Sequence, residues 1–212
     1  MRLVILSQKE ELVRMKADLI QILLRTGAIK FGTFTLASGK LSPYYIDLRL
    51  LPSYPEAFRK ILGFYVALAK TDIGLKNFDR IAGIPTAGIP FSAVLAFNLE
   101  KPFLYVRKEI KTHGRERRVE GLLMPGDRIL LVDDLITTGT SLLGAADAVT
   151  AEGAVVKNVL VLIDREEGGK QALSKLGIKL HYLLKISEAA KTLYEVGAIE
   201  QEQLKAILKQ VK

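Results

Sequence analysis

Two adjacent carboxylates, Asp133 and Asp134, carry the clearest chemical signal in the chain. They follow a buried-type apolar run, Ile129–Val132, and precede the stretch Thr137–Ser141, which reads Thr-Thr-Gly-Thr-Ser before an amphipathic segment begins at Leu142. A strand that turns into a helix in this way leaves backbone N–H groups unpaired at the helix N-terminus, where the helix dipole favours an anion. The two acids suit sugar hydroxyls or a hydrated Mg²⁺. The pattern therefore predicts a site for a ribose 5-phosphate.

Each part of this pattern also has a simpler interpretation. Acids after a strand often cap a helix, and loops rich in Thr, Gly and Ser are often turns. A cap needs only one acid, however, and a turn does not need four hydroxyls in five residues. The whole string therefore favours the binding site.

A second loop, Gly83–Pro90, follows an apolar strand and precedes a helical segment. Its two glycines, Gly83 and Gly88, allow the backbone to approach an anion closely. Taken alone, the loop is best interpreted as a plain strand-to-helix turn. Together with the loop after Asp134, it predicts a contact with pyrophosphate.

The formal net charge of +8 calls for an anionic partner, either nucleic acid or a small molecule with several phosphates. Lys and Arg side chains gather between Arg107 and Arg118, around His113, rather than along a whole face. Such a run is usually a solvated loop. The functional alternative is a mobile loop whose positive charges stabilise a departing pyrophosphate.

Two further segments leave alternatives open. Residues 31–47 are rich in aromatic side chains, and they fit a plain hairpin or a lid over a flat ring equally well. Arg165 follows an apolar strand, and its guanidinium matches a carboxylate in two-pronged fashion. On sequence alone, a local salt bridge from Arg165 to Asp164 or Glu167 is the better interpretation.

The elements that must position these residues alternate between strand and helix. Helical periodicity covers 8–26, and a second helix is expected over 55–70. Short strands are predicted at 34–36 and 44–50, and a basic amphipathic packing helix at 193–211. From residue 80 onward, predicted strands (80–84, 103–106, 128–133, 155–163, 178–184) alternate with predicted helices (88–98, 140–152, 168–176). This α/β alternation predicts a mostly parallel sheet that binds its ligand at the carboxyl ends of the strands.

Composition excludes several other classes of function. The 212 residues suffice for one large domain, with or without a small subdomain. The absence of Cys excludes disulfides, thiolate metal sites and cysteine nucleophiles, and two His residues make a histidine-built zinc site a poor hypothesis. No apolar run reaches the roughly 20 residues of a membrane span. The N-terminus lacks a secretory signal pattern, so we expect a cytoplasmic protein.

The string from Asp133 to Ser141 resembles the signature with which type I phosphoribosyltransferases bind 5-phosphoribosyl 1-pyrophosphate (PRPP). Across about residues 10–190, the chain is similar to the orotate phosphoribosyltransferase branch of that family. The strings that carry this resemblance are Lys-Phe-Gly, Ser-Gly, Ser-Pro-Tyr-Tyr, Arg-Lys-Glu-x-Lys-x-His-Gly and Asp-Arg. The resemblance implies one domain over 1–212, with a small hood subdomain from about 1–50, a core from about 55–190 and a C-terminal helix from about 190–212.

The resemblance also implies roles for individual residues. Catalytic roles are expected for Lys111, His113, Asp133 and Asp134. Orotate is expected to bind Thr137 and Arg165, with Tyr45 and Ile46 covering its ring. The residues expected to bind PRPP are Arg107, Lys108, Lys111, His113, Asp133, Asp134, Leu135, Ile136, Thr137, Thr138, Gly139, Thr140 and Ser141.

The implied reaction joins N1 of orotate to C1′ of PRPP and gives orotidine 5′-monophosphate and pyrophosphate, a step of pyrimidine biosynthesis. Mg²⁺ is the implied cofactor, bound mainly through PRPP and water near Asp133 and Asp134. The implied assembly is a homodimer that shares the 107–120 loop across its interface, without nucleic acid or membrane as a partner. A transferase for another base, and a regulator that senses PRPP and binds nucleic acid, are the alternative hypotheses.

The sequence departs from many bacterial members of this family at two places. Those members have a ligand-contacting lysine where this chain has Ala37, and Tyr-Lys where this chain has Thr86-Ala87. Both lysine contacts with PRPP are therefore absent here. We expect the arginines at 115, 117 and 118 to compensate.

Overall fold

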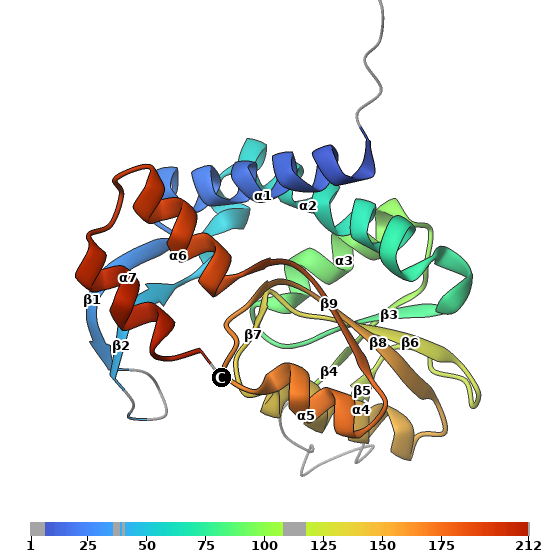
Figure 1. Ribbon diagram of the computed structural model, residues 1–212. Coiled ribbons are helices and arrows are strands. Elements are labelled where there is room, and N and C mark those ends of the chain that lie inside the picture. The colour runs from blue at the N-terminus through green and yellow to red at the C-terminus, as the bar shows by residue number, and fades with distance from the viewer. Residues whose placement is uncertain (1–6, 36–38, 40, 108–117, 212) are drawn as a thin grey trace, which may run out of the picture. The chain divides into compact units, whose positions relative to one another are not determined.

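The computed structural model describes residues 7–35, 39, 41–107 and 118–211, and the chain divides into two compact units (Figure 1). The first unit comprises Met1–Ile61 and Ser187–Lys209. The second comprises Leu62–Ile186 and Gln210–Lys212. The C-terminal helices therefore belong to the unit that begins at the N-terminus.

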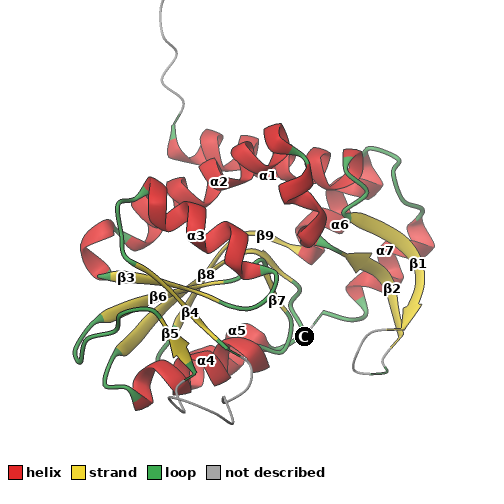
Figure 2. Ribbon diagram, turned by 180° about the vertical axis from the view of Figure 1, so that it is seen from behind, coloured by secondary structure: helices red, strands yellow, loops and turns green. Residues whose placement is uncertain are grey.

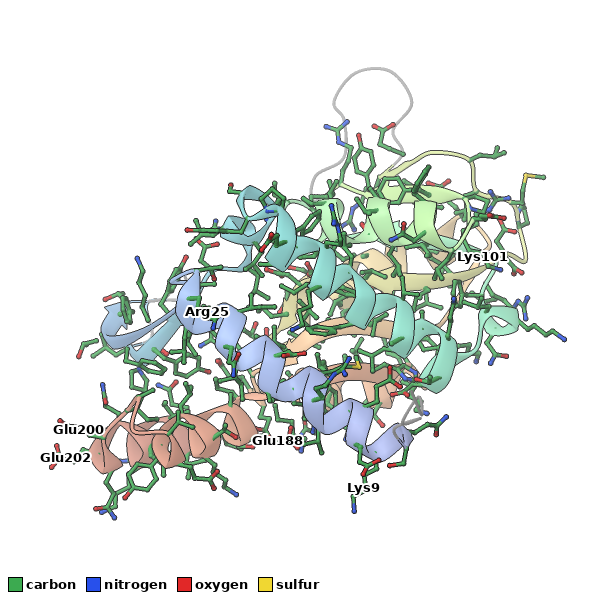
Figure 3. All side chains as sticks on the ribbon, turned by 90° about the horizontal axis from the view of Figure 1, so that it is seen from above. Lys9, Arg25, Lys101, Glu188, Glu200 and Glu202 are labelled. Carbon is green, nitrogen blue, oxygen red and sulfur yellow. The ribbon has the colours of Figure 1, made fainter. Side chains whose placement is uncertain are left out.

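The first unit combines a long helix, a hairpin and two C-terminal helices. Helix α1 (Gln8–Arg25) begins in a capping box, in which Ser7 and Glu10 each accept a hydrogen bond from the other's backbone N–H. Strands β1 (Ile29–Thr35) and β2 (Leu41–Ile46) form the antiparallel hairpin. Figure 3 labels Lys9 and Arg25 towards the two ends of α1, with Glu188 of α6 (Ile186–Glu195) beside the helix. An ion pair of 2.8 Å joins Lys16 to Glu188.

Three sequence predictions differ from the structure in this unit. The strand predicted over 34–36 begins earlier, at Ile29, and is β1; residue 36 lies outside the described residues. The predicted strand over 44–50 ends at Ile46, because Asp47 caps a 3-10 helix (Leu48–Ser53) by accepting a hydrogen bond from the Arg49 N–H. The single helix predicted over 193–211 is instead two helices, α6 and α7 (Gln201–Leu208). The break contains Gly197, whose φ of 73° leaves the helical region, and a new capping box at Glu200 starts α7.

The second unit is a sheet covered on both faces. Its strands are β3 (Arg80–Gly83), β4 (Phe103–Val106), β5 (Val119–Glu120), β6 (Arg128–Val132), β7 (Leu135–Ile136), β8 (Val155–Asp164) and β9 (Lys179–Lys185). All pairings are parallel except that of β4 with β5, and β6 and β7 lie in succession along the same strand, β8. The predicted fold class is confirmed by this sheet.

The helices of the second unit lie on opposite faces of this sheet. Figures 1 and 2 show α4 (Thr140–Ala151) and α5 (Gly169–Lys175) against one face and α3 (Gly88–Asn98) against the other. The last part of α2 (Pro55–Leu68) also belongs to this unit, and it continues into a π-helical turn (Ala69–Ile73) and a 3-10 turn (Leu75–Asn77). Because both faces are covered, the central strands read as continuous apolar runs.

The buried apolar core of this unit explains why its alternating strands and helices could be predicted from the sequence. Leu131 of β6, Val159 of β8 and Val149 of α4 have no exposed surface and belong to one cluster. Every predicted strand and helix from residue 80 to residue 185 is present with its ends shifted by two residues at most. The two-residue strands β5 and β7 were not predicted, since so short a run has no periodicity to detect. Within the described residues, no helix is both long and apolar enough to cross a membrane.

A buried histidine in β9 makes the stability of the fold depend on pH. His181 is 5% exposed, and its Nε2 lies 2.9 Å from Asn158 Oδ1 on β8. Burial, and then the charge of Lys179, lower the pKa of this imidazole below its usual value. The unfolded chain therefore takes up a proton near pH 6.5 that the folded chain resists.

We predict that the free energy of unfolding falls as the pH is lowered from 7.5 to 5.5. The fall should be clearly smaller in a His181→Gln variant, because only one other residue, His113, has an imidazole that titrates in this range. Urea unfolding at a series of pH values measures both slopes. Equal slopes in the two proteins would contradict the prediction.

Candidate active site

The acid pair lies between β6 and β7, the two strands that pair in succession with β8. The Asp133 N–H donates to the Leu160 carbonyl at 3.1 Å, and the Leu162 N–H donates to the Asp134 carbonyl at 3.0 Å, so the ladder to β8 persists across the two acids. Each carboxylate accepts a hydrogen bond from the next backbone N–H, Asp133 Oδ1 from Asp134 at 2.9 Å and Asp134 Oδ1 from Leu135 at 2.8 Å. Both charged groups are thus held locally at the carboxyl edge of the sheet.

The loop after the acids closes a small cavity. A cavity of about 170 Å³ is lined by every residue from Asp133 to Leu142. Gly139 precedes α4 with a φ of 83°, and no side chain caps the helix N-terminus. The hydroxyls of Thr138 and Thr140 lie 3.0 Å apart at the exposed rim. All the residues predicted between Asp133 and Ser141 therefore meet around one space that has acids at one end and helix N–H groups at the other.

The segment after β8 packs directly on this loop. The Arg165 N–H donates to the Ile136 carbonyl at 3.0 Å, and the Gly169 N–H donates to the Thr137 carbonyl at 2.9 Å. A Cβ at Gly169 would lie 2.6 Å from that same carbonyl, so only glycine fits. Thr137 and Arg165, both predicted to bind orotate, are therefore neighbours at the sheet edge.

The Arg165 side chain is paired with a nearby acid. Its Nη2 lies 2.9 Å from Glu167 Oε1, and both side chains are less than a tenth exposed. The salt-bridge interpretation is confirmed, with Glu167 as the partner. The role of Arg165 towards orotate stays a prediction.

The glycines of the 83–90 loop have a packing role. A Cβ at Gly88 would meet Asp133 Oδ1 at 2.7 Å, the Val132 carbonyl at 2.8 Å and Asp133 Cα at 3.0 Å. A Cβ at Gly83 would lie 2.2 Å from the Ser92 hydroxyl. The start of α3 therefore sits against the acid pair itself. The peptide bond between Pro85 and Thr86 in this loop is cis.

A tyrosine that the sequence analysis did not single out reaches the acid pair from α2. The Tyr65 hydroxyl donates to the Asp133 carbonyl at 2.7 Å, and the residue has no exposed surface. Burial, followed by the nearby charges of Asp134 and Asp133, raises the pKa of this phenol well above its usual value, so the hydroxyl remains a donor. In the sequence, Tyr65 is one more residue on the buried face of a helix, and no pattern signals its partner.

The basic segment is described only at its two ends. Arg107 pairs with Glu120 at 3.3 Å, while Arg118 donates to the carbonyls of Arg107 and Gly144 at 3.1 and 3.0 Å. The predicted residues Lys108, Lys111 and His113 lie outside the described residues, and so do Ala37, Arg115 and Arg117. Two donors of Arg118 are already engaged with backbone carbonyls, which weakens the idea that it substitutes for a missing lysine.

Tyr45 and Ile46 lie on β2, in the first unit. The Tyr45 ring is 5.7 Å from that of Phe34, and its hydroxyl accepts a hydrogen bond from Arg49 at 3.0 Å. Ile46 is 6% exposed. Their contact with an orotate ring stays a prediction.

The side chains of the acid pair offer carboxylate oxygens to Mg²⁺ beside the cavity. Among the described residues, no group of three His, Asp or Glu side chains could hold a metal ion. Mg²⁺ commonly binds one or two carboxylates together with substrate phosphates and water. Asp133 is partly exposed beside the cavity and fits this second mode.

Comparisons with known proteins agree on the family. The family model described as "Phosphoribosyl transferase domain" matches residues 66–176. The orotate phosphoribosyltransferase of Saccharolobus solfataricus is 46% identical over 188 residues, which cover 89% of this chain and 93% of that protein. The chain belongs to the orotate phosphoribosyltransferase family.

Solved structures of this family share the fold. The orotate phosphoribosyltransferase of Aeropyrum pernix matches with a TM-score of 0.76 at 34% identity, over 86% of this chain and 99% of that one. The Mycobacterium tuberculosis orotate phosphoribosyltransferase in complex with PRPP matches with a TM-score of 0.64 at 25% identity, over 82% and 98% of the two chains. The resemblance, the fold and the enzyme class expected for an orotate phosphoribosyltransferase family member are confirmed.

We predict that Gly88→Ala weakens PRPP binding at least about tenfold and lowers the free energy of unfolding by about 1–3 kcal/mol, the usual range for overpacking a tight site. The added methyl group must displace Asp133 or the end of β6. Calorimetric titration with PRPP and urea unfolding measure the two effects.

Gly63→Ala is the matched control, because a Cβ there meets nothing within 4 Å in α2. It should leave PRPP binding unchanged and should not destabilise the fold. Equal behaviour of the two variants would contradict the packing argument.

Proposed function

We propose that this chain transfers the 5-phosphoribosyl group of PRPP to N1 of orotate, giving orotidine 5′-monophosphate and pyrophosphate. The observation that carries the proposal is the cavity lined by Asp133–Leu142, with two acids and a helix N-terminus around one space. Membership in the family supports the same reaction, because its named relatives are orotate phosphoribosyltransferases.

Within this cavity, the 5-phosphate binds the backbone N–H groups of residues 137–141, and the ribose hydroxyls bind Asp133 and Asp134. The loop is suited to the phosphate because the N–H groups at the start of α4 are uncapped by side chains. The negative charge of the acids also favours positive charge developing at C1′ as the bond to pyrophosphate breaks. Holding the ribose still while N1 approaches supplies much of the remaining rate enhancement.

Orotate is placed next to Thr137 and Arg165, which are neighbours at the ends of β7 and β8. Arg165 binds the orotate carboxylate in our proposal, and to do so it shares or exchanges its contact with Glu167. This arrangement would favour orotate over bases that lack a carboxylate. Tyr45 and Ile46, on β2, are the residues that we assign to the orotate ring.

The departing pyrophosphate is bound by Arg107, Lys108, Lys111 and His113, in a homodimer that shares the 107–120 loop. Mg²⁺, held by PRPP, water and the acid pair, adds charge neutralisation when it is bound. The 83–90 loop contributes backbone N–H groups near the pyrophosphate. A cytoplasmic location and the absence of nucleic acid as a partner belong to this proposal.

The reaction is tested by following orotate absorbance in the purified protein with PRPP and Mg²⁺, beside uracil, adenine and hypoxanthine as alternative bases. Loss of orotate that needs both PRPP and Mg²⁺ is expected. Turnover with another base and none with orotate would retain the PRPP site and overturn the base assignment. Binding of PRPP without turnover of any base would favour a regulator.

We predict that Arg165→Ala raises the KM for orotate at least about tenfold and changes the KM for PRPP far less, since a hydrogen bond to a charged group contributes ~1.5–3 kcal/mol. Arg165→Lys keeps the charge and loses the two-pronged geometry, so its KM should be intermediate. Arg128→Ala removes an exposed ion pair with Asp79 and serves as the control. Unchanged orotate KM in Arg165→Ala would contradict the assignment.

A further inference from the structure

We propose that Tyr65 is a positioning residue for this reaction, one that sets the orientation of the acid pair on the ribose hydroxyls without touching the substrate itself. The inference rests on the proposed function, because it assigns the acids to the ribose. The new element is the residue that fixes the orientation of the two acids. Three features of the structure carry it.

The first feature is the burial of the Tyr65 hydroxyl among apolar side chains. Tyr65 has no exposed surface, and Leu62, Phe64 and Leu68 of the same helix are also buried. A buried hydroxyl destabilises a fold unless it makes a hydrogen bond. The Tyr65 hydroxyl makes one of 2.7 Å to the Asp133 carbonyl. A phenylalanine would fill the same volume, so the hydroxyl group has a purpose that packing alone does not explain.

The second feature is the peptide unit that this bond holds. The Asp133 carbonyl and the Asp134 N–H are the two polar ends of one planar peptide. Tyr65 binds the carbonyl end, and the N–H end donates to Asp133 Oδ1 at 2.9 Å. Rotation of this peptide would therefore move the donor that orients the Asp133 carboxylate. The same rotation would shift Leu135, whose N–H holds Asp134 Oδ1 at 2.8 Å.

The third feature is that Tyr65 is itself held in place. Its ring lies 5.6 Å from the ring of Phe91 on α3. One turn earlier on that helix, Gly88 abuts Asp133 so closely that a Cβ would lie 2.7 Å from Oδ1. Two helices thus reach the acid pair from different directions, one through a hydroxyl and one through a glycine. The Tyr65 hydroxyl therefore has little freedom to follow the Asp133 carbonyl if the Asp133–Asp134 peptide rotates.

The phosphate end of the cavity has its own supports. Thr137 is held by the Gly169 N–H, and Gly139 packs against Gly169. None of these contacts involves Tyr65. Loss of the Tyr65 hydroxyl should therefore weaken recognition of the ribose hydroxyls and leave recognition of the phosphate largely intact.

The test compares the affinities of ribose 5-phosphate and 2-deoxyribose 5-phosphate, measured by calorimetry in the full-length chain and in Tyr65→Phe. The unaltered chain should prefer the ribose compound. In Tyr65→Phe, ribose 5-phosphate should lose about threefold to tenfold in affinity, the range of one net hydrogen bond. The affinity for 2-deoxyribose 5-phosphate should change less, so the preference shrinks.

Two controls separate positioning from general destabilisation. Val156→Ala, at the far end of β8 in the core, should lower the melting temperature without changing the ratio of the two affinities. Phe91→Leu, which removes the ring that holds Tyr65, should reduce the ratio in the same direction as Tyr65→Phe. An unchanged ratio in Tyr65→Phe, whether both affinities fall together or neither falls, would overturn the role assigned to Tyr65.

Orotate turnover distinguishes this failure from failure of the proposed function. If the unaltered chain turns over orotate and PRPP while the Tyr65→Phe ratio is unchanged, only the role of Tyr65 is lost. If the unaltered chain neither turns over orotate with PRPP nor binds either sugar phosphate, both proposals are overturned.

Discussion

The carboxyl end of β6 has to place two negative charges beside a sheet without leaving backbone groups unsatisfied. Buried N–H and C=O groups need partners, and the chain supplies them across both acids. The Asp133 N–H pairs with Leu160, its carbonyl with Tyr65, and the Asp134 carbonyl with the Leu162 N–H. The two carboxylates take part in this pairing, because Asp133 Oδ1 accepts from the Asp134 N–H and Asp134 Oδ1 accepts from the Leu135 N–H. Gly88 and Gly169 follow from this arrangement, since any larger residue would push the acids or the loop aside.

The two carboxylates and the proposed phosphate-binding helix N-terminus occupy different parts of the segment from Asp133 to Ser141, so the negative acids do not lie where the phosphate is proposed to bind. Each acid accepts a hydrogen bond from the following backbone N–H, which orients its carboxylate. The proposed phosphate site lies past β7, at the start of α4, where the helix dipole favours an anion. In our proposal, the segment from Asp133 to Ser141 therefore binds both the phosphate and the ribose hydroxyls. The overall charge of +8 adds a long-range attraction for a substrate with several phosphates.

The sequence predicted those parts of the molecule that are encoded locally. The acids, the hydroxyl-rich loop and the alternation of strands and helices are contiguous patterns, and the structure places them as the patterns require. Contacts between residues far apart in the chain could not be predicted from the sequence. Nothing near Tyr65 in the sequence points to Asp133, 68 residues away. A local salt bridge of Arg165 was predicted, with Asp164 or Glu167 as its partner, because all three residues lie within four positions of the chain; the structure selects Glu167.

Errors in the sequence analysis have the same origin. The helix predicted over 193–211 is divided at Gly197 and restarted at Glu200, because capping chemistry outweighed an apolar pattern that continued through both helices. The strand predicted to Leu50 stopped at Ile46 because the Asp47 side chain caps the next turn. Propensity and periodicity act over many residues, whereas a single cap decides where an element ends.

A crystal structure of the chain with PRPP bound tests the central claim most directly. We expect the 5-phosphate within hydrogen-bond distance of the backbone N–H groups of residues 137–141, with the ribose hydroxyls on Asp133 and Asp134. We also expect the Tyr65 hydroxyl to remain on the Asp133 carbonyl in that complex. A ribose that points away from the acid pair, or a 5-phosphate bound elsewhere, would contradict the account.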